Sequence, residues 1–153
     1  MKVDVIVDLQ YGSTGKGKIA ALLARSRKYN SAVRVQSIQA GHTIYFNGEA
    51  YKMRTIPCAW VSPNVDLVLG PGIFLDKELL LHEIEMINKA TGEDVRDRLY
   101  VDYRATYIIE KDHKEERKHN LTGKIGSTSE GAGSSLIRKI WRKSEPTRVC
   151  DDP

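Results

Sequence analysis

The segment from Lys2 to Lys18, KVDVIVDLQYGSTGKGK, constrains the fold of this chain more than any other. Its apolar run from Val3 to Leu9 is typical of a buried strand in a parallel sheet. A glycine-rich turn with two lysines follows, and then Ile19, Leu22 and Leu23 stand at helical spacing. A strand, a glycine-rich turn and a helix in this order can hold a nucleotide phosphate, because backbone N–H groups and the helix N-terminus face the anion.

Strand and helix signals alternate along the rest of the chain. The expected strands are short apolar or aromatic runs bounded by turn residues, over 32–36, 43–46, 50–56, 66–69, 99–101 and 105–109. Asn47-Gly48 predicts a β-hairpin. Asp76 is expected to cap a helix over 77–90 that Gly92 ends, and further helices are expected over 110–119 and 136–143. We predict an α/β fold with a mainly parallel central sheet, flanking helices and a β-hairpin insertion, similar to that of P-loop NTPases.

Composition narrows the class of protein. With 153 residues, 41% apolar and 29% charged, the chain is expected to form a single domain over residues 1–153. It has no apolar run of membrane-spanning length and no signal-peptide pattern, so we expect a cytoplasmic protein without membrane contact. The net charge of +4 is spread among twenty acids, which argues against a nucleic-acid partner and suits a phosphorylated small molecule.

The glycine-rich turn matches the P-loop spacing G-x-x-x-x-G-K from Gly12 to Lys18. Ile19 stands where a P-loop has the Ser or Thr that binds magnesium, so either this is not a standard P-loop or its metal is held differently. Lys16 and Lys18 would supply positive charge to a phosphate. The alternative interpretation is a strand-to-helix turn with solvated lysines.

Two further segments could bind phosphate. His42, in Gln39-Ala40-Gly41-His42-Thr43, could donate to a phosphate or an oxyanion, although a lone histidine is more often structural. The remaining histidines are interpreted as surface residues: His82, His113 and His119. The Gly/Ser-rich stretch 126–135 could wrap a second phosphate. The following helix would carry Arg138 and Arg142 on one face. Composition alone favours a disordered polar loop and a solvated helix face for this region.

Together the three segments resemble the adenylosuccinate synthetase family, which carries Q-W-G-D-E-G-K-G-K, N-A-G-H-T and I-G-T-T-G-R-G-I-G-P in this order. Here they read QYGSTGKGK from Gln10, QAGHT from Gln39 and IGSTSEGAG from Ile125. In that family a nucleoside triphosphate phosphorylates the purine 6-oxygen, and L-aspartate then displaces the phosphate. The resemblance implies ATP or GTP, L-aspartate, a purine nucleotide and Mg2+ as ligands. Because family members are much longer, it also implies that this chain is the N-terminal part of a longer one.

The resemblance assigns roles residue by residue. The expected catalytic residues are Ser13, Lys16 and His42. The expected triphosphate-binding residues are Gly12, Thr14, Gly15, Lys16, Gly17, Lys18, Gly41, His42 and Thr43. The expected substrate-nucleotide residues are Ser13, Gln39, Ser127, Thr128 and Arg142. Of these, Arg142 would reach across a homodimer into the neighbouring site. Mg2+ would contact the Gly41 carbonyl, and Ser13 is a further candidate ligand.

Position 13 departs from the family pattern. Ser13 stands where the family has an acid that binds magnesium and takes the proton from purine N1, which a hydroxyl cannot do unaided near neutral pH. Its small side chain leaves space beside purine position 2, where guanine carries an amino group and hypoxanthine does not. With Gln39 for Asn and Glu130 for Arg, the pattern is similar to a bacteriophage branch that uses dGMP and aspartate to make 2-aminodeoxyadenylosuccinate. We expect that reaction here, in a host cell cytoplasm.

Three other interpretations stay open at this point. The chain could be a cellular-type enzyme that acts on IMP with GTP, or a nucleotide-binding module without catalysis. Nucleic-acid binding through the basic stretch 138–143 is the least favoured, because Trp141 is its one aromatic residue and stacking surfaces are otherwise missing.

Overall fold

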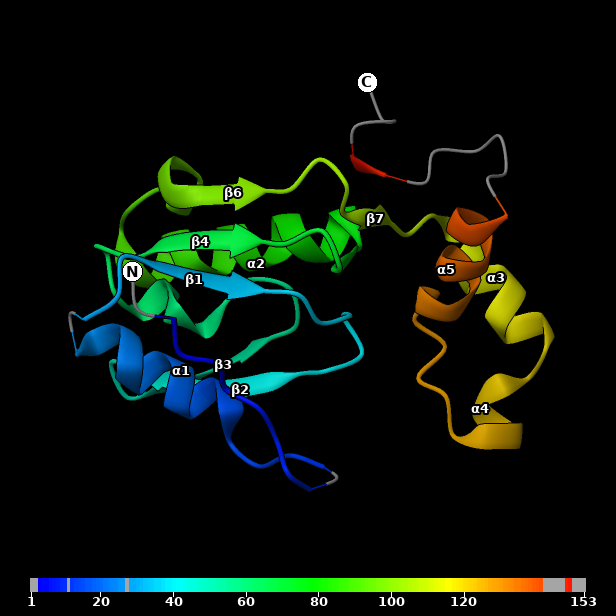
Figure 1. Cartoon of the computed structure of the whole chain (residues 1–153), viewed down its shortest axis with the longest axis horizontal. Helices are drawn as coiled ribbons and strands as arrows, with labels where there is room; N and C mark the ends of the chain where they lie inside the picture. Colours follow the sequence, from blue (N-terminus) through cyan, green and yellow to red (C-terminus); the bar gives the residue numbers. More distant parts are fainter. Residues whose placement is uncertain (1–2, 11, 27, 142–147, 150–153) are drawn as a thin grey trace.

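A computed structural model describes residues 3–10, 12–26, 28–141 and 148–149 of the chain. At its centre lies a parallel sheet of three strands in the order β1–β4–β6 (Figure 1). Their bounds are β1 Ser31–Arg34, β4 Asp66–Leu69 and β6 Leu99–Val101. The central strand β4 pairs with both neighbours. Its Leu67 lies opposite Ala32 of β1 and opposite Leu99 of β6. The predicted α/β class with a parallel sheet and flanking helices is confirmed.

Two helices, α1 (Lys16–Arg25) and α2 (Lys77–Thr91), pack into the main core. The helix α2 begins where the sequence predicts, because the Asp76 side chain accepts a hydrogen bond from the Leu79 N–H at 2.9 Å. It ends at Gly92, whose φ of 75° closes the last turn in the left-handed conformation. Within the described residues, no helix is long and apolar enough to cross a bilayer.

The predicted hairpin is confirmed as β2 (His42–Phe46) and β3 (Glu49–Met53). Asn47 and Gly48, with φ of 50° and 86°, supply the two left-handed positions that a tight hairpin turn requires. The hairpin packs on the 3-10 helix η1 (Cys58–Val61), where the fully buried Trp60 ring lies 5.0 Å from the ring of Phe46. This aromatic contact joins the hairpin to the main core.

Beyond the sheet lies a helical unit of α3 (Glu110–Lys118), α4 (Leu121–Ile125) and α5 (Ala132–Ile140) (Figure 1). The short parallel pair β5 (Phe74–Leu75) and β7 (Thr106–Tyr107) leads toward it, and the 3-10 helix η2 (Val95–Arg98) precedes β6. Buried charges hold the elements of this unit together.

The expectation of a disordered loop and a solvated helix over 126–143 is wrong for residues 132–135 and for Arg138. Residues 132–135 are helical, and Arg138 is buried against Asp112 of α3, with 2.7 Å between Nη2 and Oδ2. Each of these two side chains is 4% exposed. The local sequence could not predict this ion pair, because its partners are 26 residues apart and each one alone is typical of a solvated helix face.

The apolar run from Val3 to Leu9 does not form the predicted strand. Residues 3–8 form neither helix nor strand and belong to none of the sheets, and the side chains of Val3, Val5 and Val7 are 66–75% exposed. A strand needs a neighbouring strand to complete its backbone hydrogen bonds. The local run of apolar residues carries no information about whether such a partner lies beside it.

The strand β3 is shorter than the predicted range 50–56, because a buried carboxylate takes over the backbone N–H groups that follow it. Glu83 of α2, 1% exposed, accepts from the N–H groups of Arg54 at 2.5 Å, Thr55 at 3.0 Å and Ile56 at 2.7 Å. The chain is therefore turned out of the hairpin at Arg54.

We predict that Glu83→Gln lowers the free energy of unfolding by about 2 kcal/mol, because an amide group presents one acceptor oxygen and a donor where two carboxylate oxygens now accept. Urea unfolding measures the change. Glu85→Gln, at an exposed position of the same helix, is the matched control and should stay near wild type. Equal stabilities of the two variants would contradict this assignment.

Candidate nucleotide-binding site

The glycine-rich loop leads directly into the N-terminus of α1. Gly12 and Gly15 have φ of 104° and 90°, and the helix begins at the next residue, Lys16. A residue with a Cβ would be strained at either glycine. Ser13 and Thr14, between them, are exposed. The loop thus presents glycine backbone and a helix N-terminus, which together are suited to an anion.

Asp8 is a residue of this loop that sequence reasoning missed. Its carboxylate accepts a hydrogen bond from the Thr14 hydroxyl and forms an ion pair with the Lys16 ammonium group. The side chains of Asp8 and Lys16 are about one fifth exposed. A pocket of about 290 Å³ lies here, lined by residues 6–10 together with Thr14, Lys16 and Ile19. The sequence signal that could have identified Asp8 is its position just before a glycine-rich turn.

His42 lies against the same helix. A Cβ added at Gly17 would lie only 2.6 Å from the His42 Cβ and 3.0 Å from the Cys58 Sγ, so α1 approaches β2 as closely as a glycine allows. This contact places the first two predicted segments, 12–18 and 39–43, side by side. Two of the three expected catalytic residues, Lys16 and His42, therefore belong to one region.

The surroundings of His42 keep its imidazole neutral. Partial burial lowers its pKa most, and the positive charges of Arg34 and Lys16 lower it further, to about 4. The same region holds the buried thiol of Cys58. Burial raises its pKa to about 12, so it stays protonated near neutral pH. Near neutral pH, His42 thus has one ring N–H to donate and one ring nitrogen to accept.

Two arginines that sequence reasoning missed anchor the loop that carries Gln39. Arg34, 7% exposed, donates from Nη2 to the Ala40 carbonyl at 2.6 Å, and Arg54 donates from Nε to the Ile38 carbonyl at 2.9 Å. Gln39, between these two carbonyls, is exposed.

The other predicted triphosphate-binding residues near His42 are open to solvent. Gly41 and Thr43 are exposed. Lys18 is exposed too, and its ammonium lies 5.6 Å from the centre of the Tyr45 ring.

The third predicted segment forms an ordered hydroxyl-rich loop. The Ser127 Oγ accepts from the Ser129 N–H at 3.2 Å, and the Ser129 hydroxyl lies 2.7 Å from that of Thr122 in α4. Thr128, at the centre, is exposed. A second phosphate could reach these hydroxyl groups from solvent.

The amide groups at the N-terminus of α5 are occupied by a protein carboxylate. Glu116 of α3, 2% exposed, accepts from the N–H groups of Gly131 at 2.8 Å, Gly133 at 2.8 Å and Ser134 at 3.2 Å. Because this carboxylate fills the anion position of the helix, these amides are not open to a phosphate.

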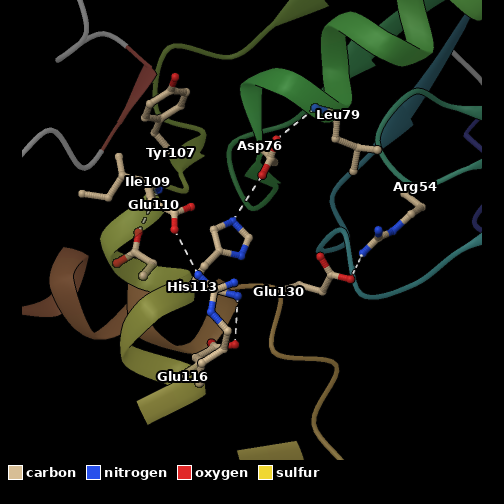
Figure 2. Close-up of polar contacts among 12 residues, drawn as sticks. Arg54, Asp76, Leu79, Tyr107, Ile109, Glu110, His113, Glu116 and Glu130 are labelled. Atoms are coloured by element: carbon tan, nitrogen blue, oxygen red, sulfur yellow. Dashed lines mark hydrogen bonds and ion pairs between the residues drawn. The ribbon is translucent and has the colours of Figure 1, made fainter. Parts of the chain in front are cut away.

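Polar contacts connect the helical unit with the rest of the molecule (Figure 2). The Glu130 carboxylate pairs with Arg54 at 2.7 Å, and His113 Nε2 lies 3.3 Å from Asp76 Oδ2. His113 is therefore a partly buried residue of this junction, which corrects its interpretation as a surface histidine; His82 and His119 are exposed as expected. Arg142 lies outside the described residues, and its role in a homodimer stays a prediction.

Comparisons with known proteins agree on one family. A family model described as adenylosuccinate synthetase matches residues 5–151. Adenylosuccinate synthetases from Thermococcus sibiricus and Methanococcus maripaludis are 35% and 37% identical over 147 residues, which is 94% and 93% of this chain. The chain spans 42% of the length of each of these curated relatives.

Two solved structures are similar over almost the whole chain. One is a fully ligated adenylosuccinate synthetase from Plasmodium falciparum, with a TM-score of 0.80 and 28% identity over 92% of this chain and 33% of that one. The other is the succinoaminodeoxyadenylate synthetase PurZ of cyanophage S-2L, bound to dGMP and to dATP as an energy donor. Its TM-score is 0.78 and its identity 33%, over 94% of this chain and 39% of that one. The predicted P-loop-NTPase-like fold is thereby confirmed.

The depressed pKa of His42 predicts a pH-dependent stability. In the unfolded chain histidine titrates near 6.5, whereas His42 in the fold titrates at about 4, so the unfolded state binds more protons between these values. This contribution to stability is fully present above pH 6.5 and is lost as the pH falls through about 4. We expect a loss of about 1–2 kcal/mol, after allowance for the exposed part of the ring.

Urea unfolding of wild type and His42→Asn, measured across this pH range, tests the prediction. The asparagine variant should lose less stability on acidification than wild type. His82→Asn, at an exposed position, is the control and should keep the wild-type slope. A wild-type slope in His42→Asn would show that this ring is not the titrating group.

Proposed function

The chain belongs to the adenylosuccinate synthetase family, and from this premise we propose that its full-length protein is a carbon–nitrogen ligase that joins L-aspartate to position 6 of a purine nucleotide. The observation that carries the proposal is the contact between Gly17 and His42, which brings the glycine-rich loop beside the histidine. A third, hydroxyl-rich loop is joined to this region by the Arg54–Glu130 ion pair.

In the proposed reaction, the glycine-rich loop and the start of α1 bind the triphosphate, with Lys16 and Lys18 as counter-charges. His42, neutral because of its low pKa, donates its ring N–H to an oxygen of the phosphoryl group being transferred. The purine loses its N1 proton to solvent, its 6-oxygen attacks the terminal phosphorus, and the diphosphate leaves. The neutral amine of aspartate then attacks carbon 6, displaces inorganic phosphate and releases a proton to solvent.

Magnesium is the metal that the family implies. No cluster of three or more potential His, Cys, Asp or Glu ligands occurs in the described part of the chain. Mg2+ is commonly held by one or two carboxylates, with phosphate oxygens and water completing its shell. Asp8 and the Gly41 carbonyl are oxygen donors that fit this pattern, and the ion would neutralise charge on the phosphates. We propose that Asp8 supplies the carboxylate that position 13 lacks.

Asp8→Asn is expected to weaken the binding of Mn2+, used as a spectroscopic substitute for Mg2+, by about tenfold in the presence of a non-hydrolysable triphosphate. Electron paramagnetic resonance of free Mn2+ measures this directly. Asp4→Asn is the matched control, because Asp4 belongs to the same segment but accepts from the Tyr29 hydroxyl. Unchanged Mn2+ affinity in Asp8→Asn would rule out this ligand.

We further propose that the nucleotide substrate is dGMP. Ser13 is small, uncharged and exposed in the loop, so it leaves room beside the purine, and its hydroxyl oxygen can accept from the 2-amino group of guanine. The likeness to the cyanophage enzyme, which was solved with dGMP, supports this choice. A site with a hydroxyl acceptor that hypoxanthine leaves unpaired disfavours IMP.

Steady-state assays of the full-length protein with L-aspartate, Mg2+ and either ATP or GTP test the substrate. We expect kcat/KM for dGMP to exceed that for IMP by at least about tenfold, and Ser13→Asp to reduce it by a similar factor. Ser31→Asp, at an exposed serine that begins β1, is the control. A preference for IMP would contradict the role of Ser13. Nucleotide binding without product would contradict the ligase itself.

A further inference from the structure

Arg54 is the residue at which three parts of the molecule meet. It follows β3 directly, and its backbone N–H donates to the buried Glu83 of α2 at 2.5 Å. Its guanidinium Nε donates to the Ile38 carbonyl at 2.9 Å, and its Nη2 lies 2.7 Å from the Glu130 carboxylate (Figure 2). One side chain thus contacts the loop that carries Gln39 and the loop that carries Thr128.

Both ends of this connection are rigidly held. On one side, the backbone of Arg54 is fixed by a carboxylate that is 1% exposed. On the other, Glu130 precedes Gly131, whose N–H donates to the 2%-exposed Glu116 at 2.8 Å. The ion pair itself is about one third exposed, so solvent screens it only in part. Because the backbone is held at or beside each residue, forming the contact costs little additional backbone entropy.

Resting on the proposed function, we infer that Arg54 and Glu130 form a clasp that positions the Gln39 loop relative to loop 126–130 and so sets the affinity for the substrate nucleotide. Both loops hold residues expected to contact that nucleotide, Gln39 on one side and Ser127 and Thr128 on the other. The Arg54–Glu130 clasp acts through these neighbours. Its two members are therefore positioning residues.

The charge at position 130 departs from the family pattern. The family pattern quoted above has arginine at this place, and an arginine here would set two guanidinium groups against each other. Glu130 instead matches the charge of Arg54. Since the pair joins the two loops only when the charges are opposite, removing one charge should loosen both loops together.

The full-length protein is compared with Glu130→Gln, Arg54→Gln and the double variant. Glu130→Gln should raise the KM and the dissociation constant for dGMP about three- to tenfold, while kcat and the KM for the triphosphate stay within about twofold. The double variant should bind dGMP as Arg54→Gln does, because each single change already breaks the pair. Glu110→Gln is the control, since it removes an exposed ion pair with Arg117.

Hydrogen exchange without substrate provides a readout that does not depend on catalysis. In Glu130→Gln, the amides of residues 37–41 and 127–130 should exchange faster together, and those of α2 should be unchanged. Independent, additive effects of the two single variants, or faster exchange with unchanged dGMP affinity, would overturn the clasp. A wild-type protein that binds dGMP but forms no product would disprove the ligase proposal, and calorimetric dGMP binding would still decide the clasp.

Discussion

The buried carboxylate of Glu83 determines the arrangement of the region around the candidate site. It accepts from the N–H groups of three consecutive residues, 54–56, and this ends the second strand of the hairpin. Burial raises the pKa of Glu83, and the backbone donors and Arg34 oppose that rise. Because Arg54 is fixed at its backbone, its guanidinium can reach the Ile38 carbonyl and Glu130 at the same time.

Glu116 repeats the same arrangement in the helical unit. Its carboxylate occupies the amide groups at the start of α5, while Asp112, one turn earlier in α3, pairs with the buried Arg138. The two acids of one helix therefore position both the start and the last turn of another. The result is a hydroxyl-rich loop that is held at Gly131 and leaves Thr128 exposed.

Local signals in the sequence predicted those elements whose cause is local. Asp76 and Gly92 bound α2 because capping and a left-handed residue act within one turn, and Asn47-Gly48 makes a hairpin for the same reason. The buried partners of α3 could not be predicted in this way. Asp112 and Glu116 lie four residues apart on a highly charged helix, and such spacing is equally typical of a solvated surface.

The candidate site shows the same difference between features with a local cause and features that depend on long-range contacts. The sequence by itself determined the chemistry that is available: a glycine-rich loop with two lysines, a histidine between small residues, a hydroxyl-rich loop and a serine in place of an acid. Only the tertiary structure decided which groups meet. Asp8 joins Lys16, His42 contacts Gly17, and Arg54 connects to Glu130, because these contacts depend on how separate segments pack. Packing also buries part of the His42 ring, which is the largest cause of its low pKa.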